Sequence, residues 1–166
     1  MGYRNKTYVI FDGDKDMWAY AYMKGWNQIE HIEFDFYDAH DLQPLTDRAS
    51  EETVRARLCQ RLSNSKQAVV LIGESTRHLY KFVRWEIETA MDLDFPIIGV
   101  NLDGSRKYDA QLCPPILRDQ YVVHVPFKAK IIQYALDNFP AEYAKRDLTA
   151  TGNRHYRDVI YTQLGL

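Results

Sequence analysis

The chain has 166 residues, most simply one domain, and its composition of 46% hydrophobic and 27% charged residues is that of an ordinary soluble globular protein. Its net charge of −2 gives no general electrostatic reason to bind nucleic acid or an anionic membrane. No apolar run approaches the roughly 20 residues that span a bilayer, and the N-terminal residues contain no signal-peptide core. The cysteines, Cys59 and Cys113, form no CxxC motif and fit a reducing, cytoplasmic location.

Short apolar runs alternate with helical patterns along the chain, which predicts a parallel sheet built from βα units. The predicted strands are residues 7–11, 33–37, 67–73, 96–101 and 121–125, and the predicted helices are residues 15–28, 50–63, 78–93 and 128–138. This series indicates an α/β, flavodoxin-like three-layer fold with a five-stranded parallel sheet in the order 2-1-3-4-5. Ligands are expected beyond the carboxyl ends of its strands.

Three local signals refine this prediction. Ser50-Glu-Glu-Thr53 is a capping signature for the second helix. Cys113-Pro114-Pro115 allows only a short helix or an irregular loop before the last predicted strand. The pattern of residues 153–163 predicts a last helix, so we expect one domain over residues 1–166 with a C-terminal helical extension over 140–166.

Three aspartates, Asp12, Asp14 and Asp16, follow the first predicted strand. The FDGD segment is similar to that of a haloacid-dehalogenase-type phosphatase, in which Asp12 would be the nucleophile and Asp14 the acid/base, with a magnesium ion between them. Asp16 stands where that pattern has Thr or Val, and the fourth strand is followed only by Asp103. We therefore expect a solvated loop in which one aspartate caps the first helix, and no metal site.

Other common sites lack their motifs. The five histidines show neither HxxxH nor HExxH spacing, which disfavours a zinc site. Ser75 follows the third predicted strand but lies outside any GxSxG nucleophile elbow. Gly13 stands alone after the first strand, so the Rossmann fingerprint is absent.

Glu86 stands out in the predicted helix 78–93. At 100° per residue this helix has one apolar sector, formed by Leu79, Phe82, Val83, Ile87, Ala90, Met91 and Leu93. Glu86 falls inside that sector, whereas Glu88 and Asp92 fall outside it. A carboxylate on an inward face loses hydration, which raises its pKa, and functional sites often contain such groups. The alternative is that Glu86 lies at the edge of the sector and reaches solvent or an arginine: Arg61, Arg77 or Arg84.

The segment VVLIGESTRHLYKFVRWEIETAM, residues 69–91, resembles a TIR (Toll/interleukin-1 receptor) domain, specifically the bacterial TIR-like group of Thoeris anti-phage defence. The resemblance covers about residues 6–125. In catalytic TIR domains the glutamate matching Glu86 is essential for cleaving NAD+. Two positions depart from the family pattern: Phe82 replaces the usual Trp, and Phe11 replaces a Ser at the end of the first strand. Trp85 points away from the apolar sector.

The resemblance implies an NAD+ nucleosidase or ADP-ribosyl cyclase in which Glu86 is catalytic. Phe11, Asp12, Ser75 and Phe82 are the expected substrate contacts, and NAD+ is the substrate, so no cofactor is expected. The implied partners are other TIR domains and a separate effector protein that senses the product. The segment 38–49 corresponds to a TIR loop that contacts other domains and gates the site.

Two alternatives remain at this stage. One is a catalytically silent TIR-like module that signals through protein–protein contacts, which the departures at Phe11 and Phe82 favour. The other is a relative of nucleoside deoxyribosyltransferases, which would also use a glutamate at an anomeric carbon.

Overall fold

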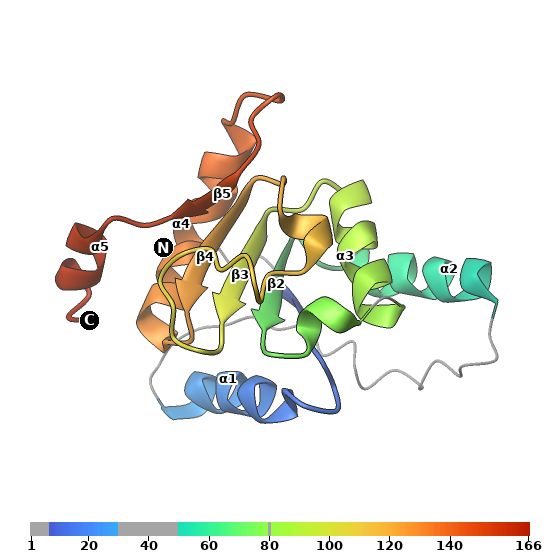
Figure 1. The fold of residues 1–166 in the computed structure, drawn as a ribbon, viewed down its shortest axis with the longest axis horizontal. Helices are drawn as coiled ribbons and strands as arrows, with labels where there is room; N and C mark the ends of the chain where they lie inside the picture. Colours follow the sequence, from blue (N-terminus) through green and yellow to red (C-terminus); the bar gives the residue numbers. More distant parts are fainter. Residues whose placement is uncertain (1–6, 30–49, 80) are drawn as a thin grey trace.

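The computed structural model describes residues 7–29, 50–79 and 81–166. Its centre is a sheet of parallel strands in the order β1-β2-β3-β4-β5, shown in Figure 1. The strands are β1 (Thr7–Ile10), β2 (Gln67–Ile72), β3 (Ile97–Asn101), β4 (Val122–Pro126) and β5 (Asn153–His155). The helices are α1 (Met17–Ile29), α2 (Glu51–Leu62), α3 (Phe82–Asp92), α4 (Ala129–Ala144) and α5 (Asp158–Gln163), with short 3-10 turns η2 (Thr76–His78) and η3 (Pro115–Leu117).

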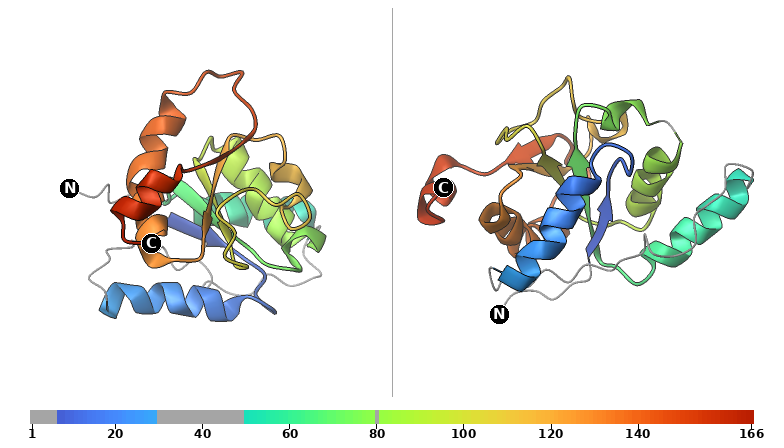
Figure 2. Two further views of the ribbon diagram at one scale, coloured as in Figure 1. Left: turned by 60° about the vertical axis from the view of Figure 1, so that its left-hand side comes forward. Right: turned by 90° about the horizontal axis from the view of Figure 1, so that it is seen from below.

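Helices cover both faces of the sheet. Because successive side chains of a strand point to opposite faces, each strand contributes to two hydrophobic cores. Val9 and Phe11 belong to a core that includes residues of α1 and α4. Tyr8 and Ile10 belong to a second core that includes residues of α2 and α3. Figure 2 shows these layers from two further sides. The α/β fold with a five-stranded parallel sheet is therefore confirmed.

The sheet differs from the prediction at one edge. The strands predicted at 7–11, 67–73, 96–101 and 121–125 are neighbours as expected, but the one predicted at 33–37 lies outside the described residues. The sheet continues beyond β4 with β5, which had been predicted as the start of a helix over 153–163. The helix in that region, α5, begins at Asp158.

Tertiary contacts explain the strand at β5. Oδ1 of Asn153 accepts a hydrogen bond from Nε2 of His124 on β4 at 2.6 Å, and its amide nitrogen donates to the carbonyl of Arg118 at 2.7 Å. These contacts, together with the pairing to β4, outweigh the helical pattern of a short polar segment.

Helix boundaries follow local side-chain contacts. Ser50 caps α2 as predicted, because its hydroxyl accepts the Thr53 amide at 3.2 Å. The helix predicted from residue 78 begins at Phe82, since residues 76–78 form η2. There the Thr76 hydroxyl accepts the Gly73 amide at 2.9 Å and donates to the carbonyl of Leu71. The Cys113-Pro114-Pro115 segment leads into η3, as predicted.

In the described ranges, no helix combines the length and apolar character that crossing a bilayer requires.

Candidate active site

Glu86 projects from α3 toward β1 and is 8% exposed. The hydroxyl of Tyr8, the second residue of β1, donates a hydrogen bond to Glu86 Oε1 at 3.1 Å. Tyr8 is fully buried. The inward position predicted for Glu86 is therefore confirmed. Arg84 pairs with Glu88 instead, and Arg77 donates to the carbonyl of Gln111.

Burial controls the charge of Glu86. Loss of hydration raises the pKa of Glu86 to about 8, while the Tyr8 hydrogen bond and the positive charge of Arg61 oppose that rise. The same burial, with the neighbouring Glu86, raises the pKa of the Tyr8 phenol, so this hydroxyl remains a donor. Burial therefore favours the protonated form of Glu86 in the free protein, and a cation placed beside it would favour the carboxylate.

Glu86 lines a cleft of about 460 Å³, which we call the Glu86 cleft. Its other walls are formed by the loop after β1, by the first residue of α1 and by the segment from the end of η2 to the start of α3: Phe11, Asp12, Gly13, Asp14, Met17, His78, Leu79, Lys81, Phe82 and Val83. Its volume lies in the range of small-molecule sites, about 300–1,000 Å³. The structure thus brings Glu86 together with three of its predicted neighbours: Phe11, Asp12 and Phe82.

Asp12 organises the loop after β1. Its Oδ1 accepts the amides of Asp14 at 2.9 Å and Lys15 at 3.3 Å. Its Oδ2 accepts the hydroxyl of Ser75, from the loop after β2, at 2.6 Å. The carboxylate therefore joins two loops at the carboxyl ends of adjacent strands, a role that requires no metal ion.

Ser75 lines a second cleft of about 450 Å³, which we call the Ser75 cleft. Its walls come from the loop after β1, from the start of α1, from the end of β2 and from the segments that follow β2 and β3: Lys15, Asp16, Trp18, Ile72, Gly73, Glu74, Leu102, Asp103 and Leu112. The Asp12–Ser75 hydrogen bond connects a wall residue of the Glu86 cleft to a wall residue of the Ser75 cleft. Ser75, the remaining predicted contact, thus lies beside the Glu86 cleft without being among its lining residues.

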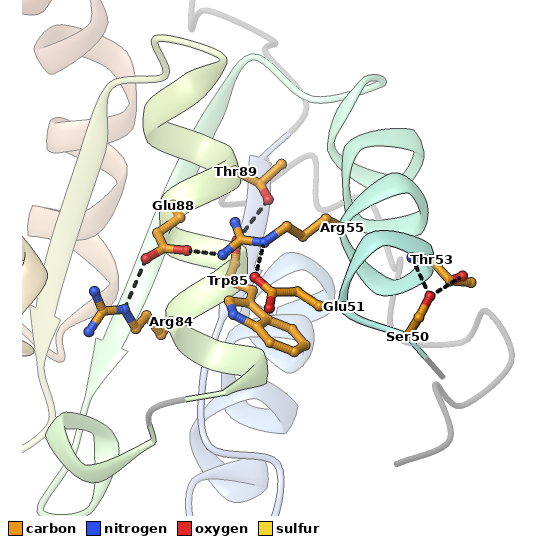
Figure 3. A network of polar contacts seen from close by, with 8 residues as sticks. All are labelled: Ser50, Glu51, Thr53, Arg55, Arg84, Trp85, Glu88 and Thr89. Atoms are coloured by element: carbon orange, nitrogen blue, oxygen red, sulfur yellow. Dashed lines mark hydrogen bonds and ion pairs between the residues drawn. The ribbon is translucent and has the colours of Figure 1, made fainter. Parts of the chain in front are cut away.

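The outer side of α3 is held against α2, as Figure 3 shows. Arg55 on α2 binds Glu51 at 2.8 Å and Glu88 at 2.7 Å, and its guanidinium lies 5.5 Å from the centre of the Trp85 ring. Trp85 therefore faces away from the Glu86 cleft, as predicted from the helical pattern. This network fixes α3 from the side opposite Glu86.

Tyr8 is the residue that the sequence interpretation missed. A tyrosine in an otherwise apolar, buried strand needs a partner for its hydroxyl. That requirement was a usable signal, but the identity of the partner depends on how α3 packs against β1.

A doubly covered parallel sheet, with a buried glutamate on the helix after β2 and a cleft at the strand ends, is the arrangement of a flavodoxin-like α/β domain with a ligand site. Residues 8–107 match the family described as Thoeris protein ThsB, TIR-like domain, and the chain belongs to this family. Membership supports a TIR-type role in anti-phage defence. No curated protein matches the chain.

Proposed function

We propose that this domain cleaves the bond between nicotinamide and ribose in NAD+ and thereby makes an ADP-ribose-type signal, with Glu86 as the catalytic carboxylate. The observation that carries the proposal is the position of Glu86, buried against Tyr8 yet lining a cleft of ligand size. A titratable group with a strongly raised pKa inside a cleft is typical of functional sites.

The chemistry needs only one carboxylate. When the glycosidic bond breaks, its electron pair stays on the pyridine nitrogen, so nicotinamide leaves as a neutral molecule and needs no proton from a general acid. Positive charge develops on the ribose, and an adjacent carboxylate stabilises that oxocarbenium-like transition state. NAD+ carries a positive charge on its nicotinamide ring, so its binding would favour ionised Glu86.

The attacking group determines the product. Water at the anomeric carbon gives ADP-ribose, whereas the adenine or a ribose hydroxyl of the same molecule gives a cyclic isomer. The walls formed by Phe11 and Phe82 would limit the access of water to the reacting carbon. In a defence pathway the product would act as a messenger for a separate effector protein, and self-association with other TIR domains would assist the reaction.

The test is to incubate NAD+ with the protein at high concentration, with and without a crowding agent, and to separate the products by chromatography and mass spectrometry. Glu86→Gln is the informative variant, because glutamine can still accept the Tyr8 hydrogen bond. Glu88→Gln, on the outer side of the same helix, is the matched control.

Release of nicotinamide by the wild type and by Glu88→Gln, with loss in Glu86→Gln, would support the proposal. Activity that survives in Glu86→Gln would refute the assignment of the site. A silent wild type under both conditions would favour the protein–protein interaction module.

A further inference from the structure

We propose that the Ser75 cleft binds the adenosine half of NAD+ and that its acidic walls exclude NADP+. This inference rests on the proposed function. The nicotinamide ribose would then occupy the Glu86 cleft. The pyrophosphate would pass the Asp12–Ser75 hydrogen bond, which connects a wall residue of each cleft.

The size and position of the two clefts fit a molecule with two halves. Each cleft has a volume of about 450–460 Å³, and both lie at the ends of adjacent strands. The short loop after β1 contributes to both, because Asp14 lines the Glu86 cleft whereas Lys15 and Asp16 line the Ser75 cleft. The Lys15 side chain would therefore supply a positive charge where the pyrophosphate passes from one cleft to the other.

Trp18 provides an aromatic surface for a base. It lines the Ser75 cleft from the first turn of α1 and is 48% exposed, unusually high for a tryptophan. Edge-on contacts with Tyr22 at 6.1 Å and Phe127 at 5.5 Å between ring centres hold the indole in place. Leu102 and Leu112 form an apolar part of the wall of the same cleft. An aromatic side chain in such a cleft favours a flat heterocycle, since every base can stack on it.

Asp16, whose carboxyl interacts with the Thr76 hydroxyl, also provides one oxygen without a hydrogen-bond partner in the same cleft. The residue is 7% exposed, and its Oδ2 has no hydrogen-bond partner among the described residues. A buried polar atom without a partner is rare in folded proteins. Acidic side chains commonly bind the hydroxyls of an adenosine ribose, which would satisfy Asp16.

The negative charge of the Ser75 cleft favours NAD+ over NADP+. The carboxylates of Asp16, Glu74 and Asp103 share this cleft with only one basic side chain, Lys15, among the described residues that line it. A free ribose hydroxyl suits this surface. The 2′-phosphate of NADP+ would lie beside the carboxylates and be repelled.

The test measures equilibrium binding of AMP, which contains the adenosine half and is not a substrate. Calorimetry should show AMP binding to the wild type, and binding weaker by about tenfold in Trp18→Ala, the loss expected for one stacked base. Val159→Ala on α5 is the control, since Val159 is also an exposed apolar residue but does not line either cleft.

A second variant avoids any question of folding. Adenosine 2′,5′-bisphosphate should bind the wild type more weakly than AMP, and Glu74→Lys, at an exposed position, should narrow that difference. Asp92→Lys, an exposed position on α3, should leave the difference unchanged.

Absence of AMP binding, or equal binding by Trp18→Ala and Val159→Ala, would overturn this inference even if NAD+ is cleaved. Selective AMP binding without cleavage would support the adenosine subsite while the proposed reaction fails.

Discussion

The Tyr8 hydroxyl donates to Glu86 Oε1 at 3.1 Å, and this hydrogen bond joins the first described strand to a helix 78 residues further along the chain. Both side chains are buried, so the bond is shielded from water. Because the donor stabilises the negative form of the carboxylate, Tyr8 opposes the rise in the pKa of Glu86 that burial causes. Tyr8 is thus a positioning residue that also controls the charge of the proposed catalytic group.

Replacing Tyr8 by Phe removes that hydroxyl while keeping the ring. We expect the pKa of Glu86 to rise further, so that the pH at which NAD+ cleavage is half-maximal moves upward from about 8. Activity at neutral pH should fall by about tenfold, since one pKa unit changes the fraction of carboxylate by that factor. The measurement is kcat/KM for NAD+ between pH 6 and pH 10.

Tyr143→Phe is the control for this substitution. Tyr143 also donates to a carboxylate, Asp94 Oδ1 at 2.8 Å, but at the opposite end of the sheet. Its removal should leave the pH profile of cleavage unchanged. A profile for Tyr8→Phe that coincides with the wild type would show that the hydrogen bond does not act on the reacting carboxylate.

Glu86 should also make the stability of the fold depend on pH. Its pKa is about 8 in the folded protein and close to 4.5 when unfolded, so the folded state binds the proton more tightly. The free energy of unfolding contributed by this group is fully present below pH 4.5 and is lost as pH rises through about 8. Glu86→Gln should lack this loss, which amounts to several kcal/mol because each pKa unit corresponds to about 1.4 kcal/mol.

Urea unfolding at pH 5 and pH 8 measures the difference, with Glu88→Gln as control. Partial burial alone would raise the pKa of Glu88, but hydrogen bonds from Arg84 and Arg55 hold this pKa below its ordinary value. The control should therefore keep the wild-type decline between pH 5 and pH 8. Equal slopes for wild type and Glu86→Gln would mean that Glu86 is ionised in the folded protein.

The sequence predicted the buried glutamate because its evidence was local. The apolar residues of α3 recur at helical spacing, and Glu86 lies among them, so its inward direction follows from the period of the helix. Strands β1 to β4 were also predictable, since buried parallel strands are continuous apolar runs. In contrast, Asn153-Arg-His carries no strand pattern, and its pairing depends on β4.

The rest of the site depends on long-range packing. Tyr8 and Glu86 meet only because α3 crosses β1, and Asp12 and Ser75 meet because β1 and β2 are neighbours. The sequence placed Asp12 and Ser75 at strand ends but did not indicate that they bind each other. Likewise, the sequence pattern does not single out Trp18, because its exposure beside a cleft is a property of the folded molecule.

The contact between α2 and α3 should contribute to stability more than to catalysis. Arg55→Ala removes ion pairs to Glu51 and Glu88 and the contact with Trp85 seen in Figure 3. Because Arg55 is partly exposed and water screens these charges, we expect a loss of about 1 kcal/mol or less. Urea unfolding measures this loss. Cleavage of NAD+ should remain within about twofold of the wild type, and a large loss of activity would mean that this network positions Glu86.

Gly73 permits the close approach of Asp16 at the start of the loop after β2. A Cβ added at Gly73 would lie 2.5 Å from Asp16 Oδ2, closer than side-chain atoms pack. Gly73→Ala should therefore destabilise the protein by about 1–3 kcal/mol, because Asp16 is buried and must move. Asp16→Ala creates the missing space, so Gly73→Ala should cost much less in that background.

The double-mutant cycle is measured by urea unfolding of the two single variants and the double variant. A coupling energy of about 1 kcal/mol or more would show that the penalty comes from the clash with Asp16. Gly13→Ala is the control, because a Cβ at Gly13 has no atom within 4 Å. Additive effects of Gly73→Ala and Asp16→Ala would contradict the predicted clash, since the cost at residue 73 would then arise from the backbone itself.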